Sequence, residues 1–255
     1  QIQSNHIQMS YYFMFVILFF VGAYFEDAYK KKELPHFFKA SGVLALAAVV
    51  GVCINISNLY HTYEYSKETM RGKSELKQEG AAASQTSSGL DRDYITNWSY
   101  GIGETLTLLV PNVKGGGSGS TMSQSEAAMA KANPMYNGIY SQLPQYFGEQ
   151  PWTAGPVYVG AFVMFLFVLG CFIVKGPLKW ALLGATIFSI LLSWGKNFMG
   201  LTDFFIDYVP MYNKFRAVSS ILVIAEFTIP LLAIFALKEI LSKPDMLKQE
   251  KNCRG

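Results

Sequence analysis

The feature that most constrains this chain is a set of apolar stretches long enough to cross a lipid bilayer. Residues 37–56 include a single charged side chain, Lys39, near their start. A helix needs about 20 such residues to cross the hydrocarbon layer at a rise of about 1.5 Å per residue. Because lipid offers no hydrogen-bond partners, each backbone N–H and C=O must pair within its own helix. The sequence therefore predicts an all-α, polytopic integral membrane helix bundle.

Five stretches of this kind divide the chain into regions. The predicted transmembrane helices are residues 9–25, 37–56, 157–174, 178–194 and 218–237. The regions are transmembrane helices 1 and 2 (1–56), an extracytoplasmic loop region (57–156), transmembrane helices 3 to 5 (157–240) and a basic tail (241–255). Charged residues make up 15% of the chain, against about 25% in a typical soluble domain. The low charge agrees with a membrane protein.

The basic residues predict how the chain is oriented. They cluster in residues 26–36, in the turn 175–179 and in the tail after residue 237. These segments share one side if all five helices cross, and lysine and arginine favour the cytoplasmic side. The tail is therefore predicted to be cytoplasmic and the long loop 57–156 extracytoplasmic. The run from Lys30 to Lys32 is interpreted as a topology anchor rather than a partner site.

Composition and motifs exclude several classes of function. The net charge is only +3 and no basic stripe contains interleaved aromatic residues, so binding to nucleic acid is not expected. The cysteines, Cys53, Cys171 and Cys253, lack the spacing of a disulfide framework or a zinc site. No complete catalytic signature such as GxSxG or HExxH is present. No motif therefore indicates a particular cofactor.

The long loop is predicted to be uneven in structure. Its first part has good helix formers and should extend the second transmembrane helix. Residues 91–112 are aromatic and half apolar, and they could lie flat at the membrane surface with Tyr94, Trp98 and Tyr100 among the headgroups. The small-residue stretches 79–89 and 114–134 are predicted to be flexible.

Two cations lie on the side of the membrane where positive charge is normally scarce. Lys214 and Arg216 immediately precede the last predicted helix. A helix N-terminus offers free N–H groups and the positive end of the helix dipole, and two cations would complete a clamp for phosphate or carboxylate. The alternative is that both long side chains only extend to the lipid–water interface. The sequence leaves the two interpretations open.

A pair of carboxylates occurs in the same loop. Asp203 and Asp207 are four positions apart, which places them on one face of a helix. They could act as a base or hold a divalent cation. They could also pair with Lys196, Lys214 or Arg216, and this structural pairing is the favoured interpretation.

Three further polar residues lie in or beside the predicted helices. Glu226 is placed about midway along the fifth helix, with Pro230 four positions later, where an ionised group costs a few kcal/mol. It would serve a proton or substrate path or, as the favoured alternative, make a hydrogen bond within the bundle. His6 and Gln8 lie just outside the first helix, and an interfacial role is favoured over a catalytic one.

Several segments resemble one family of bacterial membrane proteins. They are NHIQMSYY, YFGEQPWTAGPVYVGA, KGPLKWALL and LLSWGKNFMGLTDFFIDYVPMYNKFRAVSSILV. These segments resemble the YfhO-like family in the form found in Bacteroides-type bacteria, and residues 146–237 are the most specific part. Members of the family are much longer. Residues 11–24 lack the flanks of a signal peptide, so the chain is interpreted as an internal segment of a longer protein.

The resemblance implies a function and a location. The family is related to the GT-C class of polytopic glycosyltransferases, which implies sugar transfer from a polyprenyl-phosphate carrier at the outer face of the bacterial cytoplasmic membrane. It supplies no catalytic residue, because the first outer loop that contains the catalytic acid in GT-C proteins is missing here. Within this framework Lys214 and Arg216 would bind the lipid phosphate, and Asn213 and Tyr212 would orient sugar hydroxyls.

Two other classes of function remain open. A transporter or flippase for a lipid or polar solute would use Glu226 and Pro230, although no inverted repeat is apparent. A non-catalytic scaffold would use the glycine- and serine-rich outer loop to bind a partner protein. The expected partners are therefore membrane lipid and the polyprenyl-phosphate sugar donor, and not nucleic acid.

Overall fold

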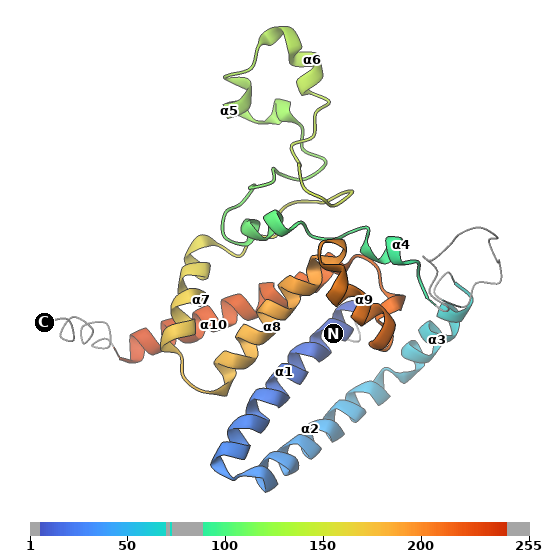
Figure 1. Cartoon of the computed structure of the whole chain (residues 1–255), viewed down its shortest axis with the longest axis vertical. Helices are drawn as coiled ribbons and strands as arrows, with labels where there is room; N and C mark the ends of the chain where they lie inside the picture. Colours follow the sequence, from blue (N-terminus) through green and yellow to red (C-terminus); the bar gives the residue numbers. More distant parts are fainter. Residues whose placement is uncertain (1–5, 70–71, 73–88, 244–255) are drawn as a thin grey trace, which may run out of the picture.

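The computed structural model describes residues 6–69, 72 and 89–243, and all regular structure in these residues is helical (Figure 1). The longer helices are α1 (Ile7–Lys31), α2 (Leu34–Ile54), α3 (Ile56–Lys67), α7 (Ala161–Ile173), α8 (Pro177–Ser193), α9 (Met199–Tyr208) and α10 (Val223–Ser242). The shorter ones are α4 (Arg92–Thr96), η2 (Ile102–Leu108), η3 (Met122–Gln124), α5 (Glu126–Met129), η4 (Pro134–Tyr136), α6 (Asn137–Tyr140), η5 (Gly195–Phe198), η6 (Tyr212–Lys214) and η7 (Val218–Leu222). The predicted all-α class is confirmed for this part of the chain.

The number of helices that could cross a membrane is lower than predicted. In the described ranges, α1, α2 and the segment Val218–Ser242 are long and apolar enough. α8 and Gly195–Tyr208 pass the same test together but are bent by 107°. α7 has 13 residues, which give about 20 Å of helix against a hydrocarbon layer of about 30 Å. The described residues therefore contain three such helices, or up to four, and the prediction of five is confirmed only in part.

The bend between α8 and α9 is built around Gly195. Its φ of +45° is rare for residues with a side chain, and an added Cβ would lie 2.1 Å from Ser99 Oγ. Ser99 Oγ accepts the N–H of Lys196 at 2.8 Å, and Thr202 Oγ1 donates to the Gly195 carbonyl at 2.9 Å. Because of this bend, α9 folds back onto the bundle, and the segment 195–217 is more compact than the simple outer loop predicted.

α7, α8 and α10 form the centre of the bundle, and α1 covers α8. An added Cβ at Gly170 of α7 would lie 3.1 Å from the carbonyl oxygen of Leu232, so glycine lets α7 and α10 approach closely. Thr186 Oγ1 and Thr228 Oγ1 are 2.7 Å apart and join α8 to α10. The Phe205 ring of α9 packs against aromatic rings of both α1 and α8.

α2 and α3 form an arm that lies apart from this centre (Figure 1). None of the residues of α2 or α3 is buried. The arm joins α1 at a tight turn, where the N–H of Glu33 donates to the Ala28 carbonyl at 2.8 Å. Next to the turn, the rings of Phe25 and Phe37 are 5.6 Å apart. α3 continues α2 after a break at Asn55, so the predicted extension of the second helix is confirmed.

Residues 89–113 form an outer layer across the ends of the helices (Figure 1). The N–H of Tyr100 donates to the Ser193 carbonyl at 2.8 Å, and the N–H of Ser219 donates to the Trp98 carbonyl at 3.1 Å. Tyr100 is only 2% exposed. The prediction that Tyr100 lies among lipid headgroups is therefore wrong, because its ring is packed inside the protein.

A small lobe, residues 114–147, projects beyond the outer layer (Figure 1). The N–H of Phe147 donates to the Lys114 carbonyl at 2.8 Å and closes the base of the lobe. Gly115 has a φ of +83°, and an added Cβ would lie 1.6 Å from the Gln145 carbonyl oxygen. Glycine is thus required here by a close approach of two backbone segments, which differs from the flexible stretch predicted for 114–134. The stretch 79–89 and the tail 241–255 lie almost wholly outside the described residues.

Candidate functional site

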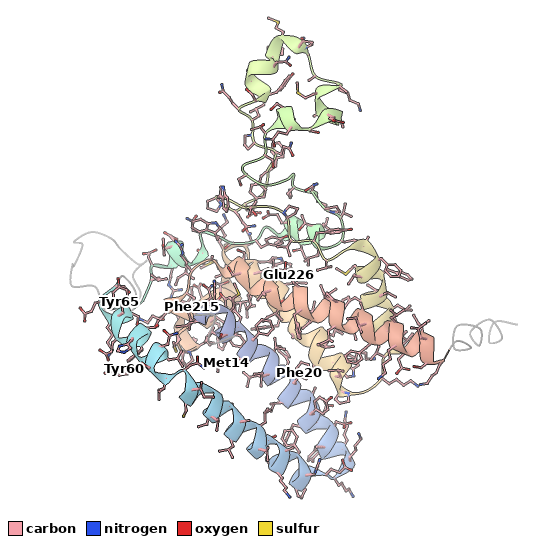
Figure 2. All side chains as sticks on the ribbon, turned by 180° about the vertical axis from the view of Figure 1, so that it is seen from behind. Met14, Phe20, Tyr60, Tyr65, Phe215 and Glu226 are labelled. Carbon is pink, nitrogen blue, oxygen red and sulfur yellow. The ribbon has the colours of Figure 1, made fainter. Side chains whose placement is uncertain are left out.

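A cavity of about 530 Å³ opens between the first turn of α1, helix α3 and the segment around η6. We call it the Lys214 cavity. It is lined by His6, Ile7, Gln8, Leu59, Thr62, Tyr63, Ser66, Met211, Lys214 and Phe215. Figure 2 labels Phe215 on the bundle side and Tyr60 and Tyr65 on the α3 arm. The structure therefore brings three residues selected from the sequence, His6, Gln8 and Lys214, into one cavity.

The segment that presents Lys214 is attached to the first turns of α1. The hydroxyl of Tyr11 donates to the Pro210 carbonyl at 2.9 Å. The same ring lies 5.0 Å from the ring of Phe215. Met211 has a φ of +66°, which turns the chain sharply just before η6. These contacts fix the position of Lys214 relative to α1.

Lys214 supplies positive charge to the cavity. Partial burial lowers the pKa of its ammonium group below the 10.5 of an ordinary lysine, because the charged form loses hydration. Ile7, Leu59 and Phe215 provide apolar walls. In surroundings of lower dielectric constant, an anion is attracted more strongly than it would be in bulk water. The cavity is therefore suited to a negatively charged group attached to an apolar molecule.

The neutral polar groups of the cavity are mainly hydrogen-bond acceptors. Gln8 Nε2 donates to the Tyr12 hydroxyl at 2.9 Å and to the Arg216 carbonyl at 2.6 Å. Both amide protons are then used, and Oε1 can accept. The hydroxyls of Thr62 and Ser66 donate to carbonyls one turn back in α3, so their oxygen lone pairs can also accept. A ligand that combines an anionic group with several hydroxyl donors would match this arrangement.

Arg216 is not among the residues that line the Lys214 cavity. Its guanidinium carbon lies 5.8 Å from the ring centre of Tyr94 and 5.7 Å from that of Trp98. The guanidinium also donates to the Tyr94 hydroxyl at 2.8 Å. Arg216 thus binds an aromatic pair of the outer layer, and the structure does not bring the two cations together as the predicted clamp.

The N-terminus of the last helix does not lie directly after Lys214 and Arg216, as was predicted. α10 begins at Val223, and η7 precedes it. In η7 the N–H of Ser219 donates to the Trp98 carbonyl at 3.1 Å, and the N–H of Ser220 donates to the Ala217 carbonyl at 3.0 Å. Because these donors are used within the protein, the helix end gives little support for an anion site.

Tyr212 and Asn213 have positions that differ from their predicted role. Tyr212 is 2% exposed and packs against the ring of Phe205, and burial raises the pKa of its hydroxyl well above 10. The Asn213 carbonyl accepts the N–H of Leu90 at 3.0 Å, and its side chain lies against Gly89. Neither residue lines the Lys214 cavity, so their positions give no support to a role in orienting sugar hydroxyls.

Asp203 and Asp207 both pair with Arg92 of α4. Arg92 Nη2 lies 2.5 Å from Asp207 Oδ1, and Nη1 contacts Asp203 Oδ1. The structural pairing favoured from the sequence is therefore present, but its partner is Arg92 and not Lys196, Lys214 or Arg216. Within residues 6–69, 72 and 89–243, no group of three or more His, Cys, Asp or Glu side chains could hold a metal ion.

Glu226 lies in the first turn of α10, and its side chain is exposed (Figure 2). It is the ninth of the 25 residues of Val218–Ser242, so it lies nearer the start of this segment than the predicted midpoint. The proline at 230 is inside α10, as predicted. An exposed carboxylate near a helix end weakens the argument for a proton path through the bundle.

Glu104 is a buried acidic residue that the sequence analysis did not select. It is 3% exposed, and its carboxylate accepts from the Tyr146 hydroxyl at 2.5 Å, from Gly101 N–H at 2.7 Å and from Glu149 N–H at 3.3 Å. Burial and the contact with Glu104 raise the pKa of Tyr146. An added Cβ at Gly148 would lie 2.0 Å from Glu104 Oε1. In the sequence, GIGE and YFGE each place a glycine directly before a glutamate. This pattern is the signal that could have indicated the contacts of Glu104 at the base of the lobe.

No protein-family model matches the chain, and neither a curated protein nor a solved structure is similar to it at a significant level.

Proposed function

We propose that the chain is a segment of a membrane glycosyltransferase that binds a polyprenyl-phosphate-linked sugar, with the phosphate and first sugar in the Lys214 cavity. The reaction class comes from the resemblance to YfhO-like proteins and their GT-C relatives. The observation that supports the site is a partly buried lysine in an apolar-walled cavity, beside helices long and apolar enough to cross a membrane. In this proposal the cavity and the lobe face outward from the bacterial cytoplasmic membrane.

The chemistry of the cavity supports a glycosyl phosphate better than a bare phosphate. Lys214 would bind the phosphate through its ammonium group. Gln8 Oε1 and the hydroxyl oxygens of Thr62 and Ser66 would accept hydrogen bonds from sugar hydroxyls, since their own protons are already donated within the protein. Arg216 would act through the outer layer, where it holds Tyr94, instead of contacting the phosphate directly.

A second candidate function is a scaffold that binds a partner protein through the lobe. Met135, Ile139 and Leu143 are exposed in the lobe and recur at a spacing of four residues. Exposed apolar side chains on a projecting element are typical of protein contacts. The transporter hypothesis is less favoured, because its main support was a mid-membrane position for Glu226.

Binding of a lipid phosphate tests the proposed site. The purified chain in nanodiscs of zwitterionic phospholipid would be titrated with farnesyl phosphate, with and without an attached sugar. We expect Lys214→Ala to weaken binding of both ligands at least tenfold, which is about 1.4 kcal/mol. Lys67→Ala is the matched control, because Lys67 pairs with Glu64 on the surface of α3 and does not line the cavity. Equal affinity of the Lys214→Ala variant and the unmodified chain would refute the site.

A further inference from the structure

We propose that residues 102–113 are embedded in the surface of the adjoining lipid leaflet, where they extend the membrane-facing side of the short helix α7. We call these residues the η2 segment, because they begin with the helix η2. The sequence predicts that the aromatic residues between positions 94 and 100 reach the lipid headgroups. We instead assign the contact with lipid to the apolar residues that follow them. The inference does not depend on the lipid-phosphate site at Lys214.

The η2 segment turns its charged and hydroxyl side chains toward the protein. Its one charged residue, Glu104, is 3% exposed. Thr105 Oγ1 accepts the indole N–H of Trp194 at 2.9 Å, and Thr107 Oγ1 donates to the Glu104 carbonyl at 2.6 Å. A segment that faces water usually has the opposite arrangement, because charged side chains are rarely buried. The outward face of the η2 segment is therefore suited to apolar surroundings.

This outward face is apolar along most of its length. Its exposed large side chains are Ile102, Leu106, Leu109, Val110 and Val113. The first three follow one another at intervals of four and three positions, as on the apolar side of an amphipathic helix. Among the exposed residues of the η2 segment, only Asn112 has a polar side chain, and it lies near the end of the segment.

The lack of outward polar groups favours lipid over a partner protein as the occupant. A protein interface contains about one hydrogen bond per 100–200 Å², and this face offers a partner few groups with which to form one. The N–H groups of Leu109 and Val110 both donate to the Leu106 carbonyl, at 3.1 and 2.9 Å. Such internal pairing is what lipid requires, because hydrocarbon supplies no hydrogen-bond partner.

The position of the segment beside α7 is a second argument for lipid. α7 exposes Phe162, Phe165 and Phe172, and its length of about 20 Å leaves about 10 Å of a hydrocarbon layer of about 30 Å uncovered. The Val159 N–H, just before α7, donates to the Leu108 carbonyl of η2 at 3.3 Å. Figure 1 shows the outer layer passing over the end at which α7 begins. A helical segment that lies flat is about 10 Å thick with its side chains, which would cover this difference.

Two side chains beside the segment are of types that are common at the level of lipid headgroups. An added Cβ at Gly103 would lie 3.6 Å from Lys114 Nζ, so this ammonium group lies alongside η2. Tyr158 is exposed next to α7, and its hydroxyl accepts the Ala161 N–H at 3.0 Å. Lysine extends its charge to the interface, and tyrosine is enriched there. Both side chains therefore agree with a segment whose apolar residues reach just below that level.

The depth of the segment can be measured with nitroxide labels on the full chain in phospholipid nanodiscs. The native cysteines at positions 53, 171 and 253 are first replaced by alanine. A label is then attached at Leu106→Cys or, as the matched control, at Ile139→Cys in the lobe. The native side chains at these two positions are 58% and 53% exposed. Electron paramagnetic resonance compares the collisions of each label with oxygen, which concentrates in lipid, and with a nickel chelate, which stays in water.

We expect the label at position 106 to collide with oxygen more than with the nickel chelate, at a depth of about 5–10 Å below the headgroups. The label at position 139 should show the reverse preference. Phe165→Cys on the exposed side of α7 gives the reference for a label in the hydrocarbon. If Leu106→Cys does not fold, as judged by its thermal unfolding, Leu109→Cys takes its place.

Two results would overturn the inference. Access of the nickel chelate to position 106 equal to its access to position 139 would place the η2 segment in water. Protection of position 106 from both reagents would show that a second copy or another protein covers it. Neither result bears on the lipid-phosphate site, which Lys214→Ala tests separately.

Discussion

Arg92 and Asp207 are 115 positions apart in the chain, yet Arg92 Nη2 donates to Asp207 Oδ1 at 2.5 Å. The same guanidinium contacts Asp203, one turn earlier in α9. One arginine of the outer layer therefore holds two turns of the helix that folds back after α8. On its other side α9 is held by Phe205, which is buried among the rings of α1 and α8. The position of α9 thus depends on an ionic contact on one face and on aromatic packing on the other.

Removing this ionic contact should have a modest effect on stability. The side chain of Arg92 is 27% exposed and that of Asp207 is 44% exposed, so solvent weakens the pair. In a double-mutant cycle of Arg92→Ala and Asp207→Asn, we expect a coupling free energy of about 0.5–1 kcal/mol that decreases with salt. Thermal unfolding in detergent at low and high ionic strength measures it. A coupling energy near zero at low salt would show that the contact between Arg92 and Asp207 does not help to position α9.

A methyl group at Gly195 should disturb the bend between α8 and α9 strongly. The backbone φ is +45°, and the new Cβ would lie 2.1 Å from Ser99 Oγ and 2.5 Å from Val218 Cγ2. We expect Gly195→Ala to lower the free energy of unfolding by about 2 kcal/mol or more. Gly200→Ala in α9 is the control, because its Cβ meets nothing within 4 Å and alanine favours a helix. Similar unfolding temperatures for the two variants would contradict the geometry of the bend.

The pH dependence of phosphate binding should reveal the lowered pKa of Lys214. Burial makes the folded protein release this proton at a lower pH than the 10.5 of an ordinary lysine. Between the lowered pKa and 10.5 the unfolded chain binds more protons than the folded protein, so rising pH favours the folded state. Over the same pH range, the folded protein loses the positive charge that binds phosphate. Affinity for farnesyl phosphate should rise near pH 6, as this phosphate monoester gains its second charge, and then fall at a pH below 10.5.

Arginine at position 214 is the control for that pH profile. Its guanidinium stays charged over the whole range, so Lys214→Arg should keep the rise near pH 6 and lose the fall at alkaline pH. An alkaline fall that persists in Lys214→Arg would show that loss of the Lys214 charge is not its cause.

Sequence patterns predict the parts of this fold that depend on local order. The apolar stretches locate α1, α2, α8 and α10, because the apolar side chains that suit a helix to a membrane or to a packed bundle lie within that helix. They overestimate the third helix, since hydrophobicity continues through residues 157–160, where Gly160 has a φ of +99° and the chain is not helical. The apolar character of a segment indicates that it lies in apolar surroundings. The length of its helix also depends on where the backbone turns, as it does at Gly160.

The candidate site is less predictable because its contacts join distant segments. Lys214 was selected from its charge, but its neighbours across the cavity come from α1 and α3, which no local spacing reveals. Arg92 follows a stretch with no regular pattern, so its pairing with α9 could not be foreseen. The positive φ of Gly195 likewise reflects the approach of Ser99 and Val218, which only the folded chain brings together.

The hydroxyl of Tyr146 should stabilise the base of the lobe. It donates to Glu104 at 2.5 Å and accepts the N–H of Gln150 at 2.9 Å. Tyr146→Phe removes both contacts in a region where Glu104 is buried, and we expect a loss of about 1–3 kcal/mol. Tyr136→Phe is the control, because Tyr136 is 45% exposed in the lobe. The measurement is limited proteolysis of the lobe, and equal cleavage rates for the two variants would count against this role of Glu104.

The glycines of the lobe provide a last test of whether this segment has a defined structure. Gly115 has a φ of +83°, and an added Cβ would lie 1.6 Å from the Gln145 carbonyl oxygen. Gly119 belongs to the same glycine-rich stretch but has nothing within 4 Å of its Cβ position. Gly115→Ala should therefore separate the two sides of the lobe base and speed proteolysis between residues 114 and 147, while Gly119→Ala should not. A flexible linker would tolerate both substitutions equally, because in a flexible chain neither glycine has a fixed neighbour to clash with.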